Sequence, residues 1–141
     1  LKRADGIKAV KRDGSAAYGE NSVSAVFAPA SISSANPEVS KAERQTAATS
    51  PLGICGCLLA MAGRTDTTAA LAKISVPTLI LVGELDTVTP AAAAQVMKAA
   101  IPGAVLAVIP KAGHLSNLDQ PDEFNRLLAE FLAPRQPRGS P

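Results

Sequence analysis

The chain has 141 residues, of which 47% are apolar and 18% are charged. This length allows one modest domain with a hydrophobic core, and the composition is that of a globular protein rather than a disordered one. A formal net charge of +2 gives no reason to expect a nucleic-acid or anionic-membrane partner, and no apolar run approaches the ~20 residues of a membrane span.

The two cysteines, Cys55 and Cys57, are separated by one residue, which is too close for an ordinary stabilising disulfide. No second Cys/His cluster completes a zinc site, so the sequence predicts neither a metal nor a cofactor. Small apolar thiols in a reducing compartment are the simpler interpretation. Because the first residues also lack the apolar core of a signal peptide, we expect a cytoplasmic protein.

The first half of the chain contains helical patterns broken by Gly, Pro and Ser, and no strand pattern. Loosely spaced apolar positions over residues 4–28 predict a helix with a break at an internal glycine. Asn36 and Ser50 each precede a proline, which places an N-cap residue before a proline at the first helical position. Residues 1–73 are therefore expected to form a small, irregular helical layer.

In the second half, apolar runs alternate with helical patterns. "VPTLILVG" (76–83) and "AVLAVIP" (104–110) are short, β-rich runs of the kind found in strands buried on both faces of a parallel sheet. Between them we expect a helix capped by Thr89 and starting at Pro90, and residues 119–132 predict an amphipathic helix with an acidic first turn. This β–α–β–α order predicts an α/β fold with two parallel strands.

Two parallel strands are too few for a stable sheet, and the first half offers no further strand. We therefore expect this chain to be the C-terminal part of a larger α/β protein. The loops that leave parallel strands share one edge of the sheet, where ligands and catalytic groups gather. One such loop carries Glu84 and Asp86, and the other carries His114, the single histidine of the chain.

Adjacent strands lie ~4.8 Å apart, so a carboxylate and an imidazole at these two loops can meet. An Asp–His pair makes a general base, because the carboxylate fixes the imidazole tautomer and stabilises the imidazolium that forms. The alternative for His114 is a loop histidine bonded to backbone groups, and the alternative for Asp86 is a turn residue before a helix. Glu84 lies nearer the end of the strand and is the second choice of carboxylate.

Two stretches, "VPTLILVGELDTVTP" and "IPGAVLAVIPKAGHLSNLDQPDEFNRLLAEFL", resemble the C-terminal part of α/β-hydrolase-fold proteins. The resemblance is to the esterase, lactonase and haloperoxidase-like branch, which includes the 3-oxoadipate enol-lactonases. It implies that the acid of a catalytic triad is Asp86, in a "VG-x-x-D" turn, and that the base is His114, in a "GH" loop. The resemblance is strong over residues 74–132 and weaker over 1–73, where it implies a helical cap.

The family's nucleophile lies in a G-x-S-x-G elbow, which this chain does not contain. "GICGC" (53–57) imitates the elbow, but it falls in a helical stretch and we expect no nucleophile there. Ser116 follows His114 too closely in the sequence to act as the nucleophile, so a loop or capping role is expected. The chain is thus predicted to supply two of three triad members, the cap and a share of the pocket wall.

These inferences divide the chain into a helical cap (1–73), the C-terminal part of an α/β-hydrolase core (74–133) and a frayed tail (134–141). The expected function is that of a fragment of a serine hydrolase acting on a small ester, lactone or related acyl substrate, inactive on its own. Several apolar cap residues could line the pocket, although packing of the cap on itself is the more common role of each. They are Phe27, Leu58, Leu59 and Met61.

Three other functions are compatible with parts of the sequence. One is a non-catalytic ligand-binding relative that uses the same cleft. Another is a hydrolase with an Asp nucleophile, as in dehalogenases and epoxide hydrolases. The third is a self-contained helical interaction module, against which the buried type of strand at "TLILV" argues.

Overall fold

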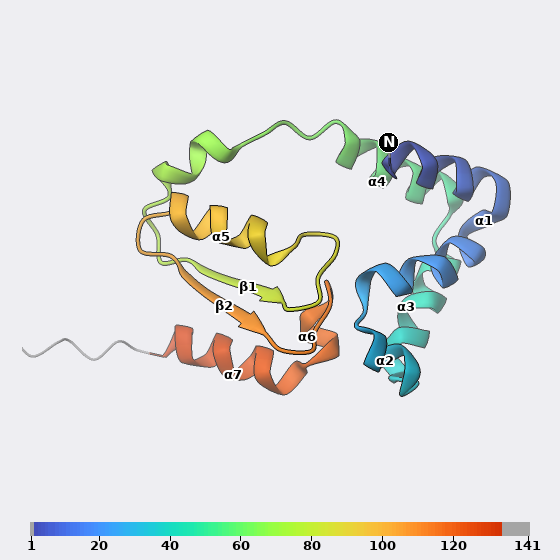
Figure 1. Ribbon diagram of the computed structural model, residues 1–141. Coiled ribbons are helices and arrows are strands. Elements are labelled where there is room, and N and C mark those ends of the chain that lie inside the picture. Colours follow the sequence, from blue (N-terminus) through green and yellow to red (C-terminus); the bar gives the residue numbers. More distant parts are fainter. Residues whose placement is uncertain (1, 134–141) are drawn as a thin grey trace, which may run out of the picture.

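The computed structural model describes residues 2–133, so the predicted tail over 134–141 lies outside the described residues (Figure 1). Two parts can be distinguished: a helical unit, formed by α1–α4, and an α/β unit, formed by the elements from η1 to α7. The elements in chain order are α1 (Lys2–Val26), α2 (Pro29–Ser33), α3 (Pro37–Ala48), α4 (Pro51–Ala62), η1 (Thr68–Lys73), β1 (Leu79–Gly83), α5 (Ala91–Ala100), β2 (Val105–Ile109), α6 (Ser116–Asp119) and α7 (Pro121–Leu132).

The helical unit is built around α1, which packs against both α3 and α4. The expected break in α1 falls at Gly14, whose φ of 82° and ψ of 179° are open to glycine but not to other residues. The two predicted N-caps are confirmed: the Asn36 side chain accepts a hydrogen bond from the Glu38 amide, and the Ser50 hydroxyl accepts one from the Gly53 amide. The helices that follow them are therefore fixed at their first turns.

Among the described residues, no single helix is long and apolar enough to cross a membrane. Taken together, α3 and α4 reach that length and composition, but the chain bends by 102° between them.

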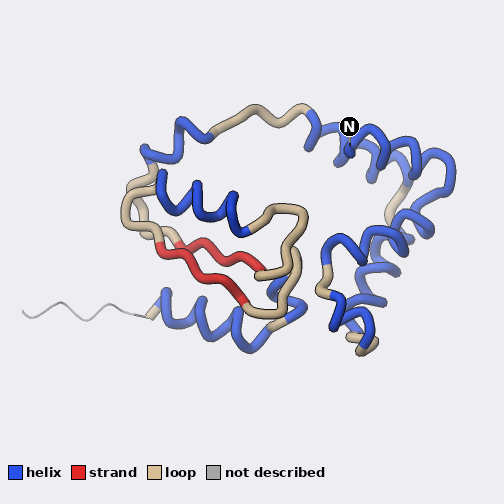
Figure 2. Tube along the Cα trace, in the orientation of Figure 1, coloured by secondary structure: helices blue, strands red, loops and turns tan. Residues whose placement is uncertain are grey.

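The α/β unit has the predicted two strands, which pair in parallel with Leu79 opposite Val105. The sheet lies between α5 on one face and α7 on the other (Figure 2). One expectation is wrong: α5 begins at Ala91 with Pro90 in the N-cap position, not at Pro90 with a Thr89 cap. The Thr89 hydroxyl donates to the Asp86 carboxylate instead. The core between the sheet and α5 is formed by Ile80, Val82, Ala94, Ile101 and Ala104.

The carboxyl ends of both strands point toward the helical unit (Figure 1). The two units meet where the segment after β2 contacts the end of α1. There, Leu115 and Leu118 pack against an apolar cluster of the helical unit that contains Phe27, and the Leu115 amide donates to the Val26 carbonyl over 2.9 Å. The loops that follow the strands thereby lie at the junction between the sheet and the helical unit.

The sheet is covered incompletely by the residues that the structure describes. Val105 and Val108 of β2 remain 41% and 43% exposed, and none of the residues of α7 is fully buried. The edge of β1 that faces away from β2 pairs with no strand within residues 2–133. The α/β unit therefore has an open strand edge beside the predicted catalytic residues.

Candidate active site

Asp86 lies in the turn that follows β1, and its side chain is almost fully buried. Both oxygens of its carboxylate are used. Oδ1 accepts the amide protons of Val88 and Thr89 over 2.8 and 2.9 Å, and Oδ2 accepts the Thr89 hydroxyl proton over 2.8 Å. Because these bonds fix the carboxylate within its own turn, Oδ2 is held toward the loop that follows β2.

His114 lies in that second loop, and its Nδ1 is 2.9 Å from Oδ2 of Asp86. The two side chains meet across 28 residues of sequence, as the order of strands predicts. Since an ionised carboxylate only accepts, Nδ1 carries the proton and Nε2 is left with its lone pair free. The imidazole is 35% exposed. The catalytic roles of the two residues stay a prediction.

Thr89 joins this pair, which sequence reasoning missed. Its hydroxyl donates to Oδ2 of Asp86, and its oxygen lies 3.2 Å from Nδ1 of His114. The hydroxyl therefore supports the carboxylate and faces the imidazole N–H at the same time. The sequence places Thr89 directly before Pro90, which favours a helix N-cap, and a threonine three residues after Asp86 is the signal that could have indicated this contact.

The other sequence candidates make no hydrogen bond to the His114 imidazole. The Glu84 carboxylate accepts the Lys111 amide proton over 2.9 Å, so it braces the two loops rather than the imidazole. Ser116 is buried as the first residue of α6, and it lines a groove that also reaches Asp86 and His114. The "GICGC" segment (53–57) lies inside α4, where no strand-to-helix turn exists. Among the described residues there is no group of three His, Cys, Asp or Glu side chains that could hold a metal ion.

The pKa of the Asp86 carboxyl reflects opposing influences. Burial raises this pKa, because it disfavours the charged form, while hydrogen bonds from His114, Thr89 and Val88 lower it. Together the hydrogen bonds prevail, and the pKa lies below its ordinary value. Asp86 is therefore ionised at neutral pH, the state in which it can hold the Nδ1 proton of His114.

The two loops continue the pairing of the strands beyond the sheet. The Glu84 amide donates to the Ile109 carbonyl over 2.9 Å, and the Leu85 amide donates to the Ala112 carbonyl over 2.8 Å. At Gly83 a Cβ atom would collide with the carbonyl groups of the histidine loop. The absence of a side chain at Gly83 thus lets the acid-bearing and histidine-bearing loops approach closely.

His114 borders two hollows. A cleft of about 480 Å³ separates the imidazole from α1, and it is lined by Tyr18, Asn21 and Met61 among others. A groove of about 410 Å³ runs along the open edge of β1 and ends at Asp86 and His114. Of the four residues proposed as pocket lining, Met61 lines this cleft, Phe27 and Leu58 are buried in the helical unit, and Leu59 is 66% exposed.

Comparison with known proteins identifies the family. The model of the alpha/beta hydrolase family matches residues 4–127, which is most of the chain. The chain is 31% identical to 3-oxoadipate enol-lactonase 2 of Acinetobacter baylyi over 123 residues, 87% of this chain and 45% of that protein. It is 38% identical to a putative carbamate hydrolase of Klebsiella pneumoniae over 72 residues, 51% of this chain and 27% of that protein.

Solved structures give the same result. A hydrolase from Pseudomonas aeruginosa superposes with a TM-score of 0.84 at 33% identity, covering 94% of this chain and 50% of the other. A thermophilic esterase from Thermogutta terrifontis gives a TM-score of 0.83 at 29% identity, covering 93% of this chain and 48% of the other. The protein is an α/β hydrolase by fold, and it belongs to the alpha/beta hydrolase family. The chain spans half or less of the length of these relatives.

Proposed function

We propose that this chain contributes the acid and the base of a Ser-His-Asp triad to a hydrolase that acts on a small ester, lactone or related acyl substrate. The observation that carries the proposal is the 2.9 Å contact between Oδ2 of Asp86 and Nδ1 of His114, whose imidazole is 35% exposed. A buried carboxylate that orients a partly exposed imidazole is the arrangement of a general base.

In the proposed reaction, a serine hydroxyl attacks the carbonyl carbon of the substrate as Nε2 of His114 removes its proton. The imidazolium that forms carries its positive charge next to the ionised Asp86, which stabilises it. His114 then protonates the leaving oxygen. In the second step the imidazole removes a proton from water, the hydroxide attacks the acyl-enzyme, and the serine leaves with the proton held by His114.

The serine is proposed to come from outside the 141 residues, since the chain contains no G-x-S-x-G sequence. The groove along the open edge of β1 supports this proposal, because it is lined by β1 and ends at Asp86 and His114. A parallel strand seated there would end beside the imidazole, where a residue in the turn after it could reach Nε2.

The substrate class rests on the relatives and on the cleft. The names of the relatives include an enol-lactonase, an esterase and a putative carbamate hydrolase, all of which concern acyl carbon–heteroatom bonds. The cleft of about 480 Å³ beside His114 has the size of a small-molecule site. The helical unit is proposed to act as the cap over this cleft.

The proposal is tested with the chain alone and with a chimera. The purified 141-residue chain should not hydrolyse p-nitrophenyl acetate. A chimera that places the region preceding the match in the Pseudomonas aeruginosa hydrolase in front of this chain should hydrolyse it. Activity of the chain alone that is lost in His114→Ala would contradict the external serine. A folded chimera whose activity survives His114→Ala would contradict the proposed base.

A further inference from the structure

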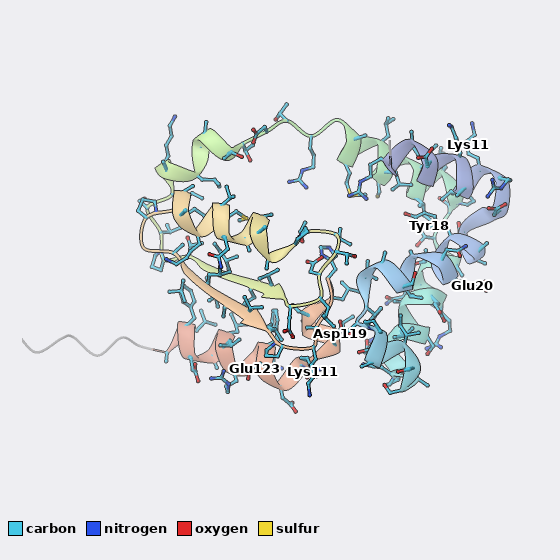
Figure 3. All side chains as sticks on the ribbon, in the orientation of Figure 1. Lys11, Tyr18, Glu20, Lys111, Asp119 and Glu123 are labelled. Atoms are coloured by element: carbon cyan, nitrogen blue, oxygen red, sulfur yellow. The ribbon has the colours of Figure 1, made fainter. Side chains whose placement is uncertain are left out.

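Asp119 is a buried carboxylate that the proposed reaction does not use. It is the last residue of α6 and only 7% exposed, and Figure 3 shows it where α6 faces the end of the helical unit. Its Oδ2 accepts the Gly113 amide proton over 2.7 Å and the Ala28 amide proton over 3.0 Å. One oxygen thus joins the residue before His114 to the residue between α1 and α2.

The residue after His114 is tied to the same place. The Leu115 amide donates to the Val26 carbonyl over 2.9 Å. Gly113 lies so close to residues 26–28 that a Cβ atom on Gly113 would be 2.9 Å from the Ala28 nitrogen. Both neighbours of His114 are therefore anchored to a segment of three residues at the end of the helical unit.

The surroundings of Asp119 make its two hydrogen bonds strong. Leu115, which precedes α6, and Leu118, within α6, pack against the apolar cluster of α1 and α3. Hydrogen bonds to an ionised acceptor are shorter and stronger than neutral ones, and a low local dielectric strengthens them further. The other oxygen, Oδ1, is buried without a partner among the described residues. Burying a carboxylate with one oxygen unpaired costs free energy, so a contribution of Asp119 to stability does not explain its place. Positioning the residues around His114 explains it better.

We propose that Asp119 is a positioning residue that fixes the backbone of His114 against the helical unit. Through Gly113 it keeps Nδ1 of His114 in line with Oδ2 of Asp86. Through Ala28 it couples the position of the helical unit to that of the imidazole. The inference rests on the proposed function, in which His114 acts as the base.

The structure offers a matched control for this proposal. The Asn36 side-chain amide donates to the Leu118 carbonyl over 3.3 Å, which is another tie between the helical unit and α6. The hydrogen bonds of Asn36 involve neither neighbour of His114. Asn36→Ser keeps an N-cap oxygen for the Glu38 amide and is too short to reach Leu118. This variant loosens the same interface without touching the proposed tether.

The test is an NMR comparison of the full 141-residue chain, Asp119→Asn and Asn36→Ser, with ¹⁵N-labelled histidine and backbone amides. An asparagine has the shape of aspartate, but its carbonyl oxygen is a weaker acceptor. In Asp119→Asn the hydrogen-exchange protection of the Gly113 and Ala28 amides should fall about tenfold, and the Nδ1 proton of His114 should shift and broaden. In Asn36→Ser the His114 signals should stay in place.

Two results would overturn the proposal: altered Gly113 and Ala28 amides with unchanged His114 signals, or His114 signals that move equally in Asn36→Ser. If Asp119→Asn does not fold, Asp119→Glu shifts the carboxylate by one methylene, and unmoved His114 signals beside a shifted Gly113 amide overturn the proposal. A wild-type spectrum without an Nδ1 proton contradicts the proposed function instead. The Asp119 proposal is then still decided by whether its substitution moves the imidazole ring signals.

Discussion

The α/β unit and the helical unit achieve their internal order by different means. In the α/β unit, one apolar cluster fills the space between the sheet and α5, and the loops after β1 and β2 are joined by backbone hydrogen bonds such as Leu85 to Ala112. In the helical unit, α1 bends at Gly14 and rests on two small apolar clusters. The Asp86–His114 pair thus depends on both units: hydrogen bonds between the loops of the α/β unit bring the two residues together, and the helical unit supplies the opposite wall of the cleft and anchors the residues on either side of His114.

The largest difference between the two units should appear in catalysis. In the active chimera, His114→Ala is expected to lower kcat/KM about 10⁴-fold, because the general base is removed. Met61→Ala, on the opposite wall of the cleft, removes only apolar contact and should change kcat/KM about tenfold or less. Steady-state kinetics with p-nitrophenyl acetate measure both. Comparable losses of kcat/KM in the two variants would contradict a catalytic role of the α/β unit beside a lining role of the helical unit.

Substitutions at two glycines should destabilise the fold for different reasons: a steric collision between loops at Gly83 and an unfavourable backbone φ at Gly14. Gly83→Ala forces a Cβ into the carbonyl groups of the histidine loop, and we expect a loss of about 3–5 kcal/mol in the free energy of unfolding. Gly14→Ala meets no atom within 4 Å but has an unfavourable φ of +82°, and should cost about 1–3 kcal/mol. Urea denaturation of both variants gives the comparison. A smaller loss in Gly83→Ala than in Gly14→Ala would show that the loops can separate.

Thr89 offers a finer test inside the α/β unit. Thr89→Val keeps the shape of the side chain and removes the hydroxyl that donates to Oδ2 of Asp86. Loss of this bond to a charged acceptor should lower kcat of the chimera about tenfold, and Thr89→Ser should restore most of it. Thr87→Val, at an exposed position of the same turn, is the matched control and should leave kcat unchanged. Equal effects in the two valine variants would indicate that only the turn conformation matters.

The smallest expected effect is on stability at acid pH. The pKa of Asp86 is lowered in the folded protein from an ordinary value of 3.8, so its contribution to stability is complete above that value and is lost as the pH falls through the folded pKa. The difference in free energy of unfolding between the wild type and Asp86→Asn should therefore shrink between pH 7 and about pH 3. A difference that stays constant over this range would show that the carboxylate gains nothing from its charge.

The two units also differ in how far the sequence predicts them. The runs over 76–83 and 104–110 predicted both strands and their parallel order, because buried strands leave an unbroken apolar pattern. That order in turn predicted the meeting of Asp86 and His114. The expected N-cap at Thr89 was wrong: the helix begins one residue later, with Pro90 in the N-cap position, and the Thr89 hydroxyl donates to the carboxylate of Asp86.

The contacts between the units were beyond sequence reasoning. Asp119 was attributed to the acidic start of the last helix, and nothing local indicates that it accepts a hydrogen bond from Ala28, 91 residues away. The burial of Phe27 and Leu58 inside the helical unit likewise depends on how α1 bends and packs against its neighbours. Local sequence patterns indicate helix or strand propensity and which face of an element is buried. The contacts between the two units depend instead on tertiary packing, which a local pattern does not contain.

The central claim, that Asp86 holds His114 as a general base, can be tested on the chain as it is. His114 is the single histidine, so ¹⁵N spectra of labelled imidazole contain the signals of one ring only. At neutral or slightly alkaline pH the wild type should show a protonated Nδ1 and an unprotonated Nε2, and Asp86→Asn should lose this preference. A wild-type ring protonated at Nε2, or a tautomer unaffected by Asp86→Asn, would contradict the account.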